Sequence, residues 1–286
     1  GSSSMLFPTH AFPLCYYLLA GLPGTLTVGL RLEQEDARGQ EPKPSPRLYM
    51  TAEDAPAMKE LEDAYGGERS FWAVQPGLCG KCVSGKDQES IMSANHEVNW
   101  SAGIYGEIQP DRIMHMLREL GAKPGQRYYD LGSGAGKTAA VAARLSGMDA
   151  TGIELSKDRH MAGCQALGNL RRARSRADGV GSVELVHGSF FDYDFSDADI
   201  LFLDSVEWTS EMMERLSQMF KGLKKGSRIV SFRDVPGLEF EHAGMTDTAG
   251  NWGEMQSKVF IKASEARQIP NLPLPSQATT RCSVRM

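Results

Sequence analysis

The sequence predicts an α/β protein with a doubly wound, mostly parallel, Rossmann-like sheet of seven strands. Three observations lead to this prediction. From residue 127 onward, short β-rich segments alternate with segments of helical periodicity. Residues 198–204 (ADILFLD) are almost continuously apolar, as expected for a parallel strand buried on both faces. A glycine-rich turn, DLGSGAG (130–136), joins the first predicted strand of this alternation to its first helix.

A helical and loop extension precedes this alternation. Thr51 is predicted to cap a helix, with Asp54 three residues later and AMKELEDAY continuing it. Residues 66–104 are rich in Gly, Ser and Asn and are predicted to be mostly loop. A second helix begins near Pro110, because the fixed φ of proline suits a first helical position. Six of the seven expected strands are located at 127–131, 149–155, 182–188, 198–204, 227–232 and 258–263. The predicted helices between them are 137–145, 157–176 and 210–223.

These elements divide the chain into four parts. Residues 1–4 (GSSS) are interpreted as an expression remnant, 5–100 as the extension, 101–265 as the main α/β domain and 266–286 as a flexible tail. The net charge of −5 is not that of a protein coated for nonspecific nucleic-acid binding. Residues 5–22 are apolar, but two prolines interrupt them and no basic residue precedes them. We therefore predict neither a signal peptide nor a membrane partner.

The five cysteines are scattered and odd in number, which favours reduced thiols over a disulfide framework. Cys79 and Cys82 have the spacing of half a zinc site. No second such pair follows, and His96 is the only nearby histidine, so no metal is predicted.

The glycine turn also contains GAGKT (134–138), the letters that end a phosphate loop. That loop needs four residues between its two glycines, but Leu131 stands where the first glycine belongs. The dinucleotide pattern GxGxxG does not fit either, because the glycines are spaced by single residues. Both the ATP and the NAD interpretations are therefore disfavoured.

S-adenosyl-L-methionine fits the turn better. Asp130 ends the first strand, where a carboxylate can pair with the ammonium group of the cofactor. The following helix offers N–H groups to its carboxylate. Glu154 ends the second strand, where it can accept hydrogen bonds from ribose hydroxyls, and Phe190 follows the third strand, where it can pack on adenine. The predicted cofactor-binding residues of these segments are Tyr128, Asp130, Leu131, Gly132, Ser133, Gly134, Gly136, Lys137, Glu154, Ser189 and Phe190.

Several further segments resemble one methyltransferase family. They are IYGEI (104–108), GIELSK (152–157), HGSFF (187–191), ILFLDSVEW (200–208), GSRIVSF (226–232) and NWGEMQSKVF (251–260). Over about residues 95–265 the chain resembles the non-SET, disruptor-of-telomeric-silencing type of histone lysine methyltransferase, which has a class I methyltransferase fold. The resemblance implies a nuclear enzyme that methylates a lysine on the folded core of histone H3 in the nucleosome. It also implies that Tyr105, Gly106, Glu107 and Ile108 close over the methionine end of the cofactor.

The departures from the family pattern fall mainly on the substrate side. Asp204-Ser205-Val206-Glu207-Trp208 stands where the family has Asn-Asn-Phe-x-Phe, and Lys258 or Val259 replaces a channel tyrosine. Ser189 stands where the family usually has Asp. The candidate catalytic residues are Asp204, Trp208 and Tyr105. Trp208 is interpreted either as a wall of the lysine channel, attracting the cation by its face, or as a core residue.

The partners and the alternatives also rest on this resemblance. Nucleosomal DNA or acidic histone surface is expected to contact the basic run 171–176 or Arg281 and Arg285, although a solvated helix face also explains that run. Two other functions stay open. One is a class I methyltransferase for another protein, an RNA or a small molecule, and the other is a cofactor-binding protein that has lost catalysis.

Overall fold

The computed structural model describes residues 49–74, 78, 105–173, 181–237, 240–250, 253–267 and 280–286. All of these lie in one compact unit, residues 47–286. The apolar segment 5–22, the pair Cys79 and Cys82, and His96 lie outside the described residues.

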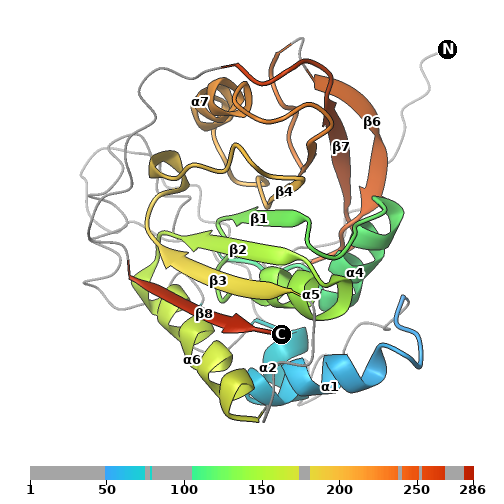
Figure 1. Cartoon of the computed structure of the whole chain (residues 1–286), viewed down its shortest axis with the longest axis vertical. Helices are drawn as coiled ribbons and strands as arrows, with labels where there is room; N and C mark the ends of the chain where they lie inside the picture. The colour runs from blue at the N-terminus through green and yellow to red at the C-terminus, as the bar shows by residue number, and fades with distance from the viewer. Residues whose placement is uncertain are drawn as a thin grey trace, which may run out of the picture. The chain divides into compact units, whose positions relative to one another are not determined.

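An eight-stranded sheet forms the centre of this unit (Figure 1), with the order β6-β7-β5-β4-β1-β2-β3-β8. The strands are β1 (Arg127–Leu131), β2 (Asp149–Glu154), β3 (Ser182–His187), β4 (Ile200–Leu203), β5 (Arg228–Ser231), β6 (Phe240–Asp247), β7 (Gln256–Lys262) and β8 (Arg281–Arg285). Strands β1 to β5 pair in parallel, whereas β6, β7 and β8 pair antiparallel at the two sides. The predicted α/β class is confirmed, with eight strands instead of seven.

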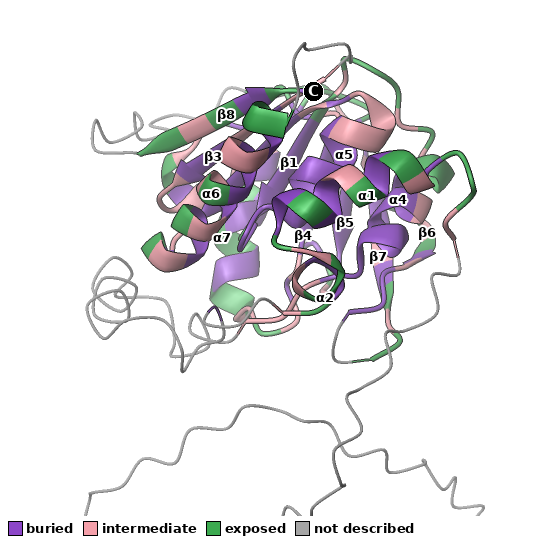
Figure 2. Cartoon of the chain, turned by 90° about the horizontal axis from the view of Figure 1, so that it is seen from below, coloured by how far each residue is buried: buried purple, intermediate pink, exposed green. Residues whose placement is uncertain are grey.

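Helices cover both faces of the sheet. They are α1 (Ala55–Ala64), α2 (Glu68–Trp72), α4 (Pro110–Glu119), α5 (Lys137–Ser146), α6 (Lys157–Ala173) and α7 (Ser210–Phe220), with a short 3-10 helix at Phe190–Asp192. Successive strand residues face opposite ways: Tyr128 packs in the core cluster with α1, α2, α4, α5 and α6, and Tyr129 in the cluster with α7. Figure 2 shows the strands buried between these helices. Within the described residues, no helix is long and apolar enough to cross a membrane.

The turn from β1 to α5 depends on glycine at Gly136. Its φ is 74°, in the left-handed region that side chains disfavour. A Cβ at this position would also lie 2.5 Å from a methyl of Leu185, so β3 packs directly against the turn. The close packing sets where α5 begins relative to the sheet.

The extension is an integral part of this fold. Met58 and Leu61 of α1 and Phe71 of α2 belong to the same buried cluster as α5. Polar contacts reinforce the packing, because Glu60 pairs with Arg144 at 2.7 Å and the Asn169 amide donates to the Ala64 carbonyl at 2.7 Å. Residues 68–72 were predicted to be loop, but they form α2; this prediction was wrong because burial of Phe71 and Trp72 outweighs the local composition.

The predicted flexible tail is wrong for residues 281–285. They form β8, which pairs antiparallel with β3 so that Val284 lies opposite Val183 and is buried. The prediction rested on the three prolines at 270–275, which are typical of a mobile tail. It could not foresee the strand, because the edge of β3 with which residues 281–285 pair exists only in the folded sheet.

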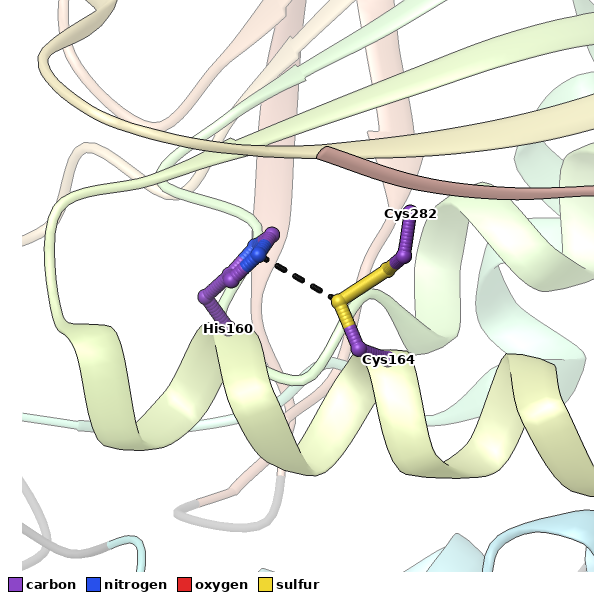
Figure 3. Close-up of side chains that lie close together, drawn as sticks. All are labelled: His160, Cys164 and Cys282. Atoms are coloured by element: carbon purple, nitrogen blue, oxygen red, sulfur yellow. Dashed lines mark hydrogen bonds between the residues drawn. A yellow bond between two sulfur atoms is a disulfide. The ribbon is translucent and has the colours of Figure 1, made fainter. Parts of the chain in front are cut away.

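The prediction of reduced thiols is also contradicted. Cys164 on α6 and Cys282 on β8 form a disulfide across a sequence separation of 118 residues (Figure 3). The pairing of β8 with β3 sets Cys282 opposite Leu185 and beside α6. No local spacing signals such a pair, because tertiary structure alone brings the two residues together.

We predict opposite effects of alanine at two glycines of α6. A Cβ at Gly163 would lie 2.6 Å from the Leu185 side chain and 2.7 Å from the Ala135 carbonyl oxygen, so Gly163→Ala should lower the free energy of unfolding by about 1–3 kcal/mol. At Gly168 the nearest atom is the flexible end of Arg172 at 3.4 Å, so Gly168→Ala should raise it by about 0.5–1 kcal/mol. Urea unfolding of both variants measures this, and equal changes would refute the packing assigned to Gly163.

Candidate active site

The candidate site lies beyond the carboxyl ends of β1 and β4, the neighbouring strands at which the sheet order reverses. Open α/β sheets bind their ligands at such a switch point. Segments far apart in the sequence meet in one pocket there. It is lined by Tyr105, Gly106, Glu107, Ile108, Asp130, Gly132, Ser133, Gly134, Lys137, Thr138 and Asp204. The predicted YGE segment, the glycine turn and Asp204 therefore share this pocket.

Two carboxyl groups of the pocket have raised pKa values. Burial raises the pKa of Asp130 to about 7, although a hydrogen bond from the Thr138 hydroxyl opposes this shift. Burial, and next the neighbouring charge of Asp130, raise the pKa of Asp204 to about 7. Both groups therefore exchange protons near neutral pH. A cation entering the pocket would favour their ionised forms.

Glu154, at the end of β2, is bonded into the glycine turn. One carboxylate oxygen accepts from the Gly134 amide at 2.7 Å, and the other accepts from the Ser156 amide at 2.7 Å. Each oxygen has a further lone pair for a ligand hydroxyl. Glu154 thus holds the turn in place and keeps acceptor capacity, although it does not line the pocket itself.

Tyr105 closes over the glycine turn. Its hydroxyl donates to Glu107 and accepts from the Ala135 amide at 3.1 Å. The ring lies so close to Gly134 that a Cβ there would collide with it, which explains why this position is glycine. The Arg159 guanidinium stacks on the ring at 4.4 Å. Tyr105 is thus held on two sides against the turn.

The ammonium group of Lys137 connects the segments around the site by three hydrogen bonds. It donates to the Ser70 carbonyl at 2.6 Å, the Ala73 carbonyl at 2.9 Å and the Glu107 carboxylate at 2.5 Å. These contacts account for all three ammonium hydrogens. Burial lowers the pKa of Lys137, and the charge of Glu107 opposes this. The lysine that makes the turn resemble a phosphate loop therefore joins the extension to the YGE segment.

A pair of stacked aromatic residues lies beside the glycine turn at Gly132. The Trp208 ring stacks on Phe190 with ring centroids 5.0 Å apart and an interplanar angle of 25°. It also lies 3.5 Å from where a Cβ of Gly132 would be. Ser189 caps the short helix that carries Phe190, accepting from the Phe191 amide at 3.2 Å. Since a base inserted between two rings needs about 7 Å, adenine would stack on an outer face or displace Trp208. The role of Trp208 as a wall of the lysine channel stays a prediction.

Several residues of the site were not identified from the sequence. Thr138 contacts Asp130, and Tyr65 of the extension donates to the Ala135 carbonyl at 3.1 Å. Thr138 lies two residues after the glycine turn and could have been found there, whereas nothing local indicated Tyr65. The two candidates for the missing channel tyrosine lie on β7: Lys258 donates to Asp234 at 2.7 Å, and Val259 is buried.

Comparison with known proteins identifies the family. The family model described as histone methylation protein DOT1 matches residues 89–260, more than half of the 286 residues. The chain belongs to this family. The resemblance of the YGE segment and the glycine turn is thereby confirmed. The DOT1 match includes the whole pocket and leaves α1 and α2 outside it.

Individual relatives match shorter stretches. The chain is 29% identical over 140 residues to an H3 lysine-79 specific histone-lysine N-methyltransferase of Yarrowia lipolytica, covering 47% of this chain and 28% of that protein. It is 30% identical over 154 residues to the protein of the same description in Aspergillus fumigatus, covering 50% of this chain and 30% of that protein. The chain thus spans less than a third of the length of these two curated relatives.

Two prokaryotic proteins are also similar. A protein-lysine N-methyltransferase of Saccharolobus islandicus is 31% identical over 126 residues, covering 43% of this chain and 71% of that protein. Among solved structures, an RNA methyltransferase from Salinibacter ruber in complex with S-adenosyl-L-homocysteine matches with a TM-score of 0.40 and 24% identity, covering 55% of this chain and 92% of that one.

We predict that Lys137→Met lowers the free energy of unfolding by about 3 kcal/mol, because it leaves the Glu107 carboxylate buried without its cation. Lys59→Met is the matched control. Its pair with Asp63 is exposed to solvent, so this substitution should change the free energy of unfolding far less than Lys137→Met does. Chemical denaturation of both variants measures the difference. Similar values for the two would show that the buried pair does not stabilise the site.

Proposed function

We propose that this protein transfers a methyl group from S-adenosyl-L-methionine to a lysine of histone H3 within the nucleosome. The observation that carries the proposal is the meeting of the YGE segment, the glycine turn and Asp204 in one pocket. The match to the DOT1 family and the descriptions of its curated relatives support this reaction class.

The polar groups of the pocket fit the cofactor. The Asp130 carboxylate can pair with the cofactor's ammonium group, and the amides at the start of α5 can bind its carboxylate. Ser133 Oγ is buried, and within the described residues it has no hydrogen-bond partner. A buried polar atom without a partner at a pocket wall is satisfied when a polar ligand binds. These features support the predicted cofactor-binding residues.

Bound S-adenosyl-L-methionine supplies a methyl group on a positively charged sulfur, ready for attack by a neutral amine. The residues of the chain have two tasks. Tyr105 and Glu107 hold the pocket closed against the turn, so that the reacting groups stay aligned. The lysine must also lose its proton before it attacks.

We assign this second task to Asp204. Asp204 lines the pocket, and burial raises the pKa of its carboxyl group to about 7 before a ligand binds, so the group is ionised above that pH and can act as a general base. Once ionised, it accepts a proton from the incoming lysine ammonium, directly or through water. The family carries Asn here, which cannot accept this proton. The aspartate thus gives this chain its own route for deprotonation.

The nucleosome offers surfaces for the basic residues outside the pocket. Arg171 and Arg172 are exposed in the last turn of α6, and Arg281 and Arg285 are exposed on β8. We propose that they contact DNA phosphates or acidic histone surface and that the protein acts in the nucleus. Methylation of a lysine on another protein is the second candidate, favoured by the similarity to a protein-lysine methyltransferase and by the altered channel residues.

The direct test is methyl transfer from labelled S-adenosyl-L-methionine to nucleosomes, free histone H3, unrelated lysine-rich proteins and small RNA. We expect methyl groups on one core lysine of H3, and on nucleosomes in preference to free H3, because the resemblance implies a folded substrate. Mass spectrometry of the products measures this. Methylation of unrelated proteins alone would favour the second candidate, and methylation of RNA alone would overturn both.

We also predict a pH-dependent effect of Asp204→Asn. The variant should still bind the cofactor, but at pH 7 its transfer rate should be about tenfold lower because no side chain takes the lysine proton. The difference should narrow toward pH 9, where more lysine is deprotonated in solution. Single-turnover rates between pH 6 and 9 measure this. A constant ratio across the range would contradict the role of Asp204 as a base.

A further inference from the structure

A second cluster of reactive side chains lies away from the pocket. His160 and Cys164 are one helical turn apart on α6, and Cys282 reaches them from β8 (Figure 3). One donor atom of each residue lies within 4.8 Å of the others. The imidazole Nε2 of His160 lies 3.3 Å from Cys164 Sγ, and the two cysteine Cα atoms are 5.6 Å apart. We call these three residues the edge cluster.

The donors of the edge cluster are those that zinc prefers. Two thiolates and an imidazole make a soft, mixed sulfur and nitrogen set. With zinc–sulfur and zinc–nitrogen bonds of about 2.3 and 2.0 Å, tetrahedral geometry puts a sulfur and a nitrogen roughly 3.5 Å apart. The 3.3 Å between His160 and Cys164 is close to this value.

We propose that the edge cluster binds one Zn²⁺ ion when Cys164 and Cys282 are thiols. Both thiols release their protons to solvent, two zinc–sulfur bonds and one zinc–nitrogen bond form, and water takes the fourth position. Water reaches the site because both cysteines are only half-buried. A small side-chain rotation separates the sulfurs to about 3.8 Å, the tetrahedral spacing for two thiolates on zinc.

The disulfide and the zinc complex are alternative crosslinks between the same two elements. β8 has five residues and pairs only with β3 within the described part of the chain, so it gains from a covalent or metal link to α6. Reducing compartments such as the nucleus open disulfides. In the reduced protein, zinc holds β8 against β3, the strand that leads into Ser189 and Phe190. In the oxidised protein, the disulfide holds β8 in this place.

The test uses the full chain with Cys79→Ser and Cys82→Ser, so that this other cysteine pair cannot bind metal. After reduction with a phosphine under anaerobic conditions, Co²⁺ is titrated in as a spectroscopic probe for Zn²⁺. We expect one Co²⁺ per chain, tetrahedral d–d bands and a thiolate charge-transfer band, all removed by added Zn²⁺. Peroxide converts the two thiols to the disulfide with release of two waters, and this should abolish binding.

Two further variants make the assignment specific. Cys282→Ser and His160→Ala, each in the same background, should weaken Co²⁺ binding by at least about 100-fold, whereas Cys15→Ser should not change it. Circular dichroism and cofactor binding check that each variant is folded. Absence of the thiolate band in the reduced background protein, or unchanged affinity in Cys282→Ser, would overturn the proposal.

Discussion

The buried contact between Lys137 and Glu107 is the interaction on which the site depends. It joins three parts of the chain: the start of α5, the YGE segment and, through the carbonyls of Ser70 and Ala73, the extension. A buried charge is tolerated only when it is paired and its hydrogen bonds are satisfied. The lysine therefore requires α2 to be in place. For this reason α2, which lies outside the DOT1 match, belongs physically to the site.

Close packing also fixes the position of the glycine turn. Leu185 of β3 presses on Gly136, and Tyr105 covers Gly134, so the turn is fixed from both sides. Glu154 then binds the Gly134 amide from the end of β2. A rigid turn places the amides at the start of α5 without reorganisation when a ligand binds, which preserves affinity. Strands β1, β2 and β3 thus jointly hold the glycine turn in one conformation.

Burial is the main cause of the raised pKa values of the two aspartates in the pocket. The charge of Asp130 further raises the pKa of Asp204, and the charge of Glu154 further raises the pKa of Asp130. A cationic ligand would draw both toward the ionised form, so binding of the ligand and loss of protons are linked. The aspartate at 204 therefore brings a second titratable carboxyl group into the pocket beside Asp130.

The sequence by itself determined the α/β class, the β1 to α5 turn, the ends of most elements and the family, since these depend on local periodicity and on motifs of adjacent residues. Its candidates Asp130 and Asp204 follow neighbouring parallel strands and meet in one pocket, because the carboxyl ends of parallel strands share one edge. Only the tertiary structure decided that residues 281–285 form an edge strand, that Cys164 meets Cys282, and that Lys137 binds the extension. Each of these joins residues whose sequence separation exceeds 60, and no local pattern records which distant surfaces a folded chain brings together.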